Sequence, residues 1–237
     1  MYSFESRVRY SEVNSEKQMT LLALLEYLQD CCTFQSEDLG IGVDYLSEEQ
    51  VAWVLSSWQI EILRYPQMAE QIKVCTWPYD FKNFYGYRNF LIEDETGNTL
   101  AKANSVWVFM DVARMRPTRI QERVADAYRA ETSPMLSGEW AERKIVVPKN
   151  GEKRPPVQVA RHHIDTNHHM NNGKYIQTAE EFLPEAFVVS GLRAEYKKAA
   201  VLGDILYPKV TLEERQAWIT LEDEQGRAYA VIQFFRK

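Results

Sequence analysis

The sequence has 237 residues, of which 45% are hydrophobic and 26% charged, a composition typical of globular proteins. Its formal net charge of −6 excludes general nucleic-acid binding, because such proteins need a basic surface opposite the phosphates. The three cysteines, Cys31, Cys32 and Cys75, have neither the number nor the spacing of a disulfide framework or a zinc site.

The first residues lack the apolar stretch of a signal peptide, and no window approaches the roughly 18–20 apolar residues of a membrane helix. We therefore expect a cytoplasmic protein in a reducing compartment, with no membrane or nucleic-acid partner. Self-association as a homodimer is left open.

One amphipathic helix and four strands are predicted in the first half of the chain. Leu21, Leu25 and Leu28 recur at helical spacing, which predicts a helix over residues 20–38. β-branched and aromatic residues then predict strands over residues 51–64, 72–80, 85–93 and 99–111.

Residues 113–156 differ from the segments on either side and predict a linker. They are charged and contain Pro117, Pro134, Pro148, Pro155 and Pro156. Because proline interrupts helices and central strands, we expect one short helix, near residues 119–130, and otherwise irregular structure.

The second half of the chain repeats the order of the first. We predict a helix over residues 172–186 and strands over residues 190–199, 204–212, 217–222 and 228–236. The sequences DETGN and DEQGR are hairpin signals, in which Gly97 and Gly226 supply a positive φ.

Three pairs of segments match in the same order in the two halves, which predicts an internal duplication. Residues 10–28 match 163–183, residues 59–66 match 193–200, and residues 92–103 match 221–232. The offsets are 153 (165 − 12), 134 (195 − 61) and 129 (222 − 93), so they only shrink. This is the expected result of shorter connections in the second copy.

One long helix on an antiparallel sheet is the hot-dog unit. We therefore predict an α+β fold of two tandem hot-dog units packed side by side. Residues 1–112 would form the N-terminal unit, 113–156 the linker and 157–237 the C-terminal unit.

All four histidines, His162, His163, His168 and His169, fall within eight residues of the second copy. A zinc site is one interpretation, because imidazole and the carboxylate of Asp165 are suitable ligands. The spacing matches no recognised ligand pattern and no cysteine lies nearby, so we expect neither a metal nor a cofactor.

An acid–base loop before a helix explains the same residues more simply. Asp165, Asn167 and His169 alternate, so in an extended segment all three side chains lie on one face. Asn171 or Asn172 then caps the following helix, whose N-terminus favours a developing oxyanion. A carboxylate, an amide, an imidazole and a helix end suit acyl transfer.

The same alignment places Glu12, Asn14 and Glu16 in the first copy, which has no histidine. We therefore expect one competent site per chain. The first copy would shape the substrate pocket.

The loop D-x-N-x-H-x-N-N-x-x-Y, Asp165 to Tyr175, resembles the signature of the acyl-ACP thioesterases of plants and bacteria. Further similar segments are residues 52–66, 81–92, 101–111 and 194–204. The resemblance implies hydrolysis of fatty acyl-ACP to free fatty acid and acyl carrier protein, without a cofactor.

By the same resemblance, the catalytic residues are Asp165, Asn167 and His169. We also expect Asn171, Asn172 and Tyr175 to bind the substrate. The carboxylate of Asp165 has two open roles. It attacks the thioester carbonyl to give a mixed anhydride, or it helps His169 to activate water.

Basic side chains are candidates for contact with an acidic carrier protein, since charge complementarity aids encounter. They are Arg114, Arg116, Arg119, Lys197 and Lys198. The alternative is that the arginines simply belong to a solvated linker.

One departure from the family pattern follows Lys197 and Lys198, where the family usually has Glu and often Cys. Here Ala199 and Ala200 stand in those places, which suggests a repacked apolar wall. Glu195 lies too far along the strand to substitute, and we expect a structural role for it. An acyl-CoA thioesterase and a non-catalytic acyl-thioester binding protein remain alternatives.

Overall fold

The computed structural model describes residues 1–138 and 140–237. The chain divides into two compact units. The first comprises Met1–Ser56 and Ile62–Trp140, and the second comprises Ser57–Glu61 and Ala141–Lys237.

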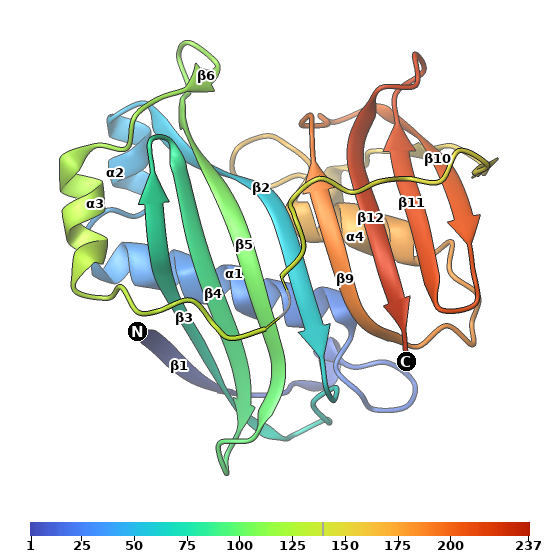
Figure 1. Cartoon of the computed structure of the whole chain (residues 1–237), viewed down its shortest axis with the longest axis horizontal. Helices are drawn as coiled ribbons and strands as arrows, with labels where there is room; N and C mark the ends of the chain where they lie inside the picture. Colours follow the sequence, from blue (N-terminus) through green and yellow to red (C-terminus); the bar gives the residue numbers. More distant parts are fainter. Residues whose placement is uncertain (139) are drawn as a thin grey trace. The chain divides into compact units, whose positions relative to one another are not determined.

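The first unit is a helix-covered antiparallel sheet with strand order β1-β3-β4-β5 (Figure 1). Its elements are β1 (Tyr2–Arg7), η1 (Tyr10–Glu12), α1 (Leu21–Asp38), α2 (Val43–Glu48), β2 (Val51–Ile62), β3 (Gln71–Lys82), β4 (Tyr85–Asp94), β5 (Thr99–Asp111), β6 (Arg116–Pro117) and α3 (Glu122–Arg129). Five residues of β2 are counted with the second unit.

Helix α1 begins where the sequence provides a cap. The hydroxyl of Thr20 accepts a hydrogen bond from the backbone N–H of Ala23 at 3.2 Å, as an N-cap threonine does. The buried face of α1 includes Leu24, Leu28 and Cys31, which are at most 1% exposed. This face packs against β3, so burial of apolar area holds the helix on the sheet.

The second unit has the same plan, with strand order β9-β12-β11-β10-β7 (Figure 1). Its elements are β7 (Glu152–Lys153), β8 (Val157–Gln158), η2 (Arg161–His163), α4 (Asn172–Glu180), β9 (Val189–Tyr196), β10 (Ile205–Leu212), β11 (Gln216–Glu222) and β12 (Ala228–Arg236). Residues Ser57–Glu61 of β2 pair with β9. Helix α4 contacts β11 and β12.

The α+β fold with two hot-dog units is confirmed. The predicted strands are present with ends shifted by a few residues, but α4 ends at Glu180 and not at residue 186. Pro184 prevents the helix from continuing to residue 186, because a proline has no N–H to donate to the carbonyl of residue 180 and its ring clashes with that carbonyl. No helix in the described parts of the chain is long and apolar enough to span a membrane.

The two DExGx turns confirm the third repeat match. Asp94 accepts hydrogen bonds through Oδ1 from the backbone of Thr96 and Asn98, and Asp223 does the same for residues 225 and 227. Gly97 and Gly226 have φ values of 82° and 76°, as predicted.

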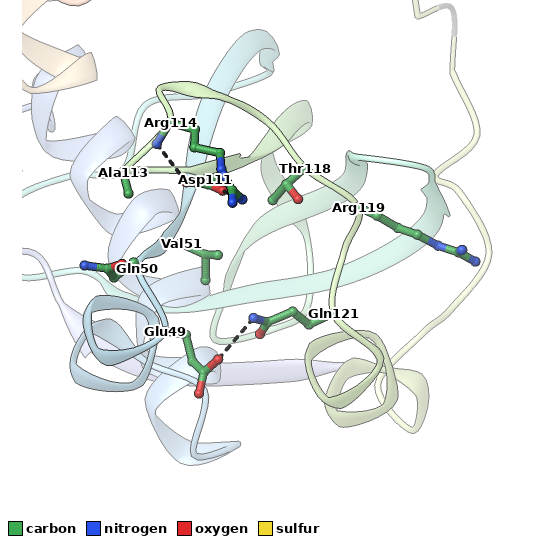
Figure 2. A pocket seen from close by; sticks show the side chains of 9 residues that line it. All are labelled: Glu49, Gln50, Val51, Asp111, Ala113, Arg114, Thr118, Arg119 and Gln121. Carbon is green, nitrogen blue, oxygen red and sulfur yellow. Dashed lines mark hydrogen bonds and ion pairs between the residues drawn. The ribbon is translucent and has the colours of Figure 1, made fainter.

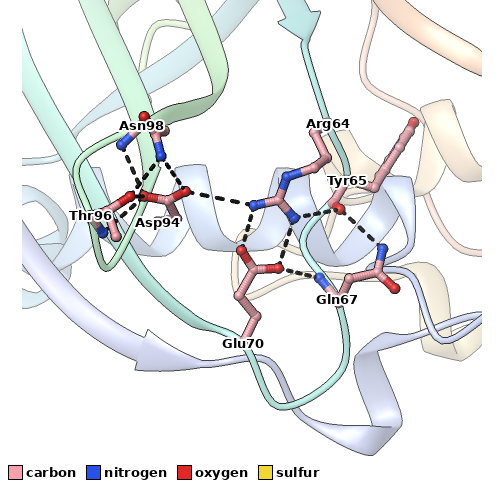
Figure 3. A network of polar contacts seen from close by, with 7 residues as sticks. All are labelled: Arg64, Tyr65, Gln67, Glu70, Asp94, Thr96 and Asn98. Atoms are coloured by element: carbon pink, nitrogen blue, oxygen red, sulfur yellow. Dashed lines mark hydrogen bonds and ion pairs between the residues drawn. The ribbon is translucent and has the colours of Figure 1, made fainter.

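A basic side chain braces each of these turns from the end of a neighbouring strand. Arg64 forms a paired hydrogen bond with Glu70 and reaches Asp94 at 3.8 Å (Figure 3). In the second unit Lys198 reaches Asp223 at 3.4 Å. Arg64 and Lys198 are 134 residues apart (198 − 64), which is the offset of the second repeat match.

Candidate active site

The loop that carries Asp165 and His169 is a tight turn. Ile164 and Met170 form a β-bridge, the N–H of Asp165 donates to the carbonyl of His169 at 2.8 Å, and the N–H of His168 donates to the carbonyl of Asp165 at 3.1 Å. The prediction of an extended segment was therefore wrong. The turn brings Asp165 and His169 opposite each other across the bridge, and Asn167 lies exposed at the tip.

The carboxylate of Asp165 shapes this turn. Its Oδ1 accepts hydrogen bonds from the N–H of Asn167 at 2.8 Å and of His169 at 3.3 Å. Aspartate and asparagine favour turns because their side chains bond to the backbone two residues later. His168 has a φ of 60°, a conformation that a residue other than glycine adopts at some cost.

The first copy contains the same turn two residues away from where the sequence alignment placed it. Asn14 Oδ1 accepts hydrogen bonds from the N–H of Glu16 at 3.1 Å and of Gln18 at 2.9 Å, and Lys17 has a φ of 62°. Asn14 therefore corresponds to Asp165, an offset of 151 (165 − 14) instead of 153. The letters E-V-N and D-T-N matched by chance, whereas the hydrogen-bonded turn fixes the register.

The corrected register sharpens the contrast between the two copies. Glu16 corresponds to Asn167 and Gln18 to His169. The first copy therefore has the amide of Asn14 in place of the carboxylate of Asp165, and the amide of Gln18 in place of the imidazole of His169. The turn itself does not need a charge at position 165, because Asn14 forms the equivalent hydrogen bonds without one.

His163 has a backbone-binding role that the sequence did not reveal. Its Nδ1 accepts a hydrogen bond from the N–H of Ala160 at 3.0 Å, just as Glu12 accepts one from the N–H of Arg9 at 2.8 Å. An accepting Nδ1 carries no proton, so the ring is held as the Nε2–H tautomer. Burial lowers the pKa of His163 further, with contributions from neighbouring cationic groups, which also favours the neutral ring.

The start of α4 lies directly after the turn. Asn171 is the N-cap, as predicted, and its side chain accepts a hydrogen bond from the N–H of Gly173 at 2.8 Å. The hydroxyl of Tyr196, on β9, donates to the carbonyl of Asn172 at 2.9 Å. These contacts fix the first turn of the helix beside the loop.

Tyr175 is a positioning residue in this structure. It is 2% exposed, and its hydroxyl oxygen accepts a hydrogen bond from the backbone N–H of Ala200 at 2.7 Å. The carbonyl of Ala200 in turn accepts from the N–H of Met170 at 2.8 Å, next to His169. Tyr175 therefore holds the strand end that supports the turn.

The first copy explains why a tyrosine is needed here. Pro66 corresponds to Ala200, and its carbonyl accepts from the N–H of Met19 at 2.8 Å. Proline has no N–H, so the helix needs no acceptor at that place, and Leu24 corresponds to Tyr175.

The predicted apolar wall at Ala199 is wrong. Ala200 is fully buried, but Ala199 is exposed to solvent, as are Val201 and Leu202. A side chain at position 199 extends from an exposed strand end and is not enclosed. Glu195 is nearly buried and accepts a hydrogen bond from the N–H of Ile145 at 3.2 Å.

The basic residues predicted to meet a carrier protein differ in their partners. Arg114 pairs with Asp111 at 3.0 Å, Lys197 with Glu195 at 3.1 Å and Lys198 with Asp223 at 3.4 Å. Arg116 and Arg119 are exposed.

A pocket of about 380 Å³ in the first unit lies beside Arg114 (Figure 2). Arg114 folds onto Asp111, while Arg119 extends away from it. The lining residues are Glu49, Gln50, Val51, Asp111, Ala113, Arg114, Thr118, Arg119 and Gln121. This mostly polar set contains none of the predicted catalytic residues.

Metal ligation is not suggested by the geometry. Within residues 1–138 and 140–237, no three side chains of His, Cys, Asp or Glu come together as a metal site. The three cysteines are buried and free.

A helix on an antiparallel sheet, present twice in one chain, defines a tandem hot-dog protein. Residues 1–128 match the acyl-ACP thioesterase N-terminal domain, and residues 148–231 match the acyl-ACP thioesterase C-terminal domain. The chain belongs to the acyl-ACP thioesterase family.

Individual relatives are distant. The chloroplastic acyl-[acyl-carrier-protein] hydrolase FATB3 of Cuphea viscosissima is 25% identical over 205 residues, covering 81% of this chain and 50% of the relative. The chain thus spans about half the length of the curated relatives it matches.

Two solved structures share the fold over nearly the whole chain. The 12:0-ACP thioesterase from Umbellularia californica has a TM-score of 0.88 at 19% identity, covering 100% of this chain and 96% of that one. An acyl-ACP thioesterase from Bacteroides thetaiotaomicron has a TM-score of 0.88 at 21% identity, covering 99% and 97%.

Proposed function

We propose that the chain hydrolyses fatty acyl-ACP to free fatty acid and acyl carrier protein, at the turn formed by Asp165, Asn167 and His169. One observation carries the proposal beyond family membership. The two copies build the same turn, yet only the second has a carboxylate at the position of Asp165 and an imidazole at the position of His169, where the first has Asn14 and Gln18. The fold does not require the negative charge of Asp165, and the turn lies directly before the N-terminus of α4, so we infer that this carboxylate has a catalytic role.

The contacts of Asp165 leave it able to react. Oδ1 holds the turn, and within the described residues no hydrogen bond reaches Oδ2. In one route, water adds to the thioester carbonyl, His169 takes a proton from the water and passes it to the carrier thiolate, and the carbon–sulfur bond breaks to give the free acid. In the other route, Oδ2 adds, the carbon–sulfur bond breaks and the thiolate is protonated; water then cleaves the mixed anhydride, which releases the acid and restores Asp165. His169 supplies the acid–base function for those transfers, and the amide of Asn167, at the tip, orients the carbonyl.

The partner we propose is acyl carrier protein, met by Arg116 and Arg119 and by the lysine pair Lys197 and Lys198. Exposed cations of this kind aid encounter with an acidic protein more than final affinity. We further propose action in the cytoplasm. A homodimer is a proposal that sedimentation of the purified chain would decide.

The experiment is release of free thiol from a panel of acyl-ACPs of increasing chain length, with the same acyl chains on CoA as the second arm. The proposal predicts turnover with at least one acyl-ACP and a higher kcat/KM than for the matching acyl-CoA. A higher kcat/KM for acyl-CoA would identify an acyl-CoA thioesterase. Tight binding of acyl-ACP without release of thiol would identify a non-catalytic binding protein.

A further inference from the structure

A buried cation lies in the first unit, and among the described residues no carboxylate pairs with it. Arg88 is on β4 and 7% exposed. Its guanidinium donates to the side-chain oxygens of Gln35, on α1, and of Thr76, on β3, the latter at 3.1 Å. It also lies over the ring of Tyr128, on α3, at 5.1 Å from the centroid.

All of these partners are uncharged. Burial raises the pKa of the Tyr128 hydroxyl and of the nearby Cys32 thiol, so both stay protonated and neither supplies a negative charge. Within the described parts of the chain, Arg88 forms no ion pair with a carboxylate. A buried guanidinium is expensive unless an anion compensates it.

A second, independent donor points to the same place. Gln35 is 1% exposed, and its Nε2 has no hydrogen-bond partner among the described residues, although its Oε1 accepts from Arg88. Nearly all buried amide groups are satisfied in folded proteins, so an unpaired N–H₂ beside an unpaired cation needs an acceptor. Guanidinium and amide N–H groups together suit the two oxygens of a carboxylate.

We propose that Arg88 and Gln35 form a carboxylate-binding site between α1 and β4. The site lies beside an apolar cluster of Ile41, Val51, Phe109, Val124 and Tyr128, so the ligand is a carboxylate with an apolar chain. The ligand of this kind that we propose is a free fatty acid, and the inference does not rest on the proposed function.

Calorimetric titration of the full chain with sodium hexanoate and with hexanamide tests the site. We expect hexanoate to bind at least about tenfold more tightly than hexanamide. The near-isosteric substitution Gln35→Glu supplies an internal counter-charge, so it should abolish hexanoate binding and raise the urea midpoint of unfolding. Gln29→Glu, the same change elsewhere on α1, should leave binding unaltered.

Equal binding of hexanoate and hexanamide, undiminished binding by Gln35→Glu, or a lower urea midpoint in that variant would each overturn the site. Absence of thiol release from acyl-ACP would count against the proposed function and leave the hexanoate result standing.

Discussion

The hydroxyl of Tyr175 offers a direct measure of how the catalytic turn is supported. Tyr175→Phe removes the acceptor for the N–H of Ala200 and leaves the packing of the ring nearly unchanged. Tyr175 is 2% exposed and Ala200 is fully buried, so water cannot replace the lost acceptor.

Leaving a buried N–H unsatisfied costs about 1–3 kcal/mol. For a chain of this size each kcal/mol lowers Tm by roughly 2–4 °C. We therefore expect Tyr175→Phe to unfold at a clearly lower urea midpoint, with an unchanged dependence on urea concentration.

The first copy supplies the control, because Pro66 has no N–H to satisfy. In the Ala200→Pro background the same Tyr175→Phe change should cost little, and the double-mutant cycle should show a coupling of about 1 kcal/mol or more. Equal costs in the two backgrounds would refute the idea that Tyr175 serves the amide of Ala200.

Three further outcomes follow from the loop. Because the pKa of His163 is lowered in the folded chain, the unfolded chain binds a proton below pH 6.5 that the folded chain does not, and stability should fall as the pH falls through the folded pKa. Urea midpoints measured from pH 7 to pH 5 should show this loss, and His163→Gln should reduce it. His168→Val should destabilise by at least about 1 kcal/mol in urea unfolding, because a β-branched residue tolerates positive φ poorly, and Lys17→Val should behave alike. Ala199→Glu, at an exposed position, should change stability by less than about 0.5 kcal/mol, and a loss of several kcal/mol would restore the buried-wall interpretation.

Hydrophobic spacing and β-branched runs in the sequence were enough to predict α1, α4, the eight long strands from β2 to β5 and from β9 to β12, and the duplication, whereas α2 and β1 were not predicted. Hydrophobic residues recur at the helix or strand period because one face of each element is buried, so the pattern can be read directly from the sequence. The DExGx turns were predicted from the positive φ that Gly97 and Gly226 supply, and the structure confirms that conformation.

Features that depend on a side chain meeting a distant backbone group were not predictable. The register of the first repeat was wrong by two residues because Asn14 and Asp165 are recognised by the N–H groups they accept from, and not by their neighbours in sequence. The burial of Ala200 and exposure of Ala199 depend on where β9 ends. The first copy has Leu24 and Pro66 at the positions where the second copy has Tyr175 and Ala200. This correspondence could be recognised in the sequence only once the register was known.

The central claim is that the charge of Asp165 serves catalysis and its Oδ1 serves the fold. Thiol release from acyl-ACP by Asp165→Asn, compared with Asn14→Asp in the other copy, tests this most directly. Each substitution keeps an oxygen able to accept the two backbone hydrogen bonds, so both proteins should fold normally. We predict that Asp165→Asn lowers kcat by at least about a hundredfold and that Asn14→Asp leaves it unchanged. Near-normal turnover by folded Asp165→Asn would contradict the account.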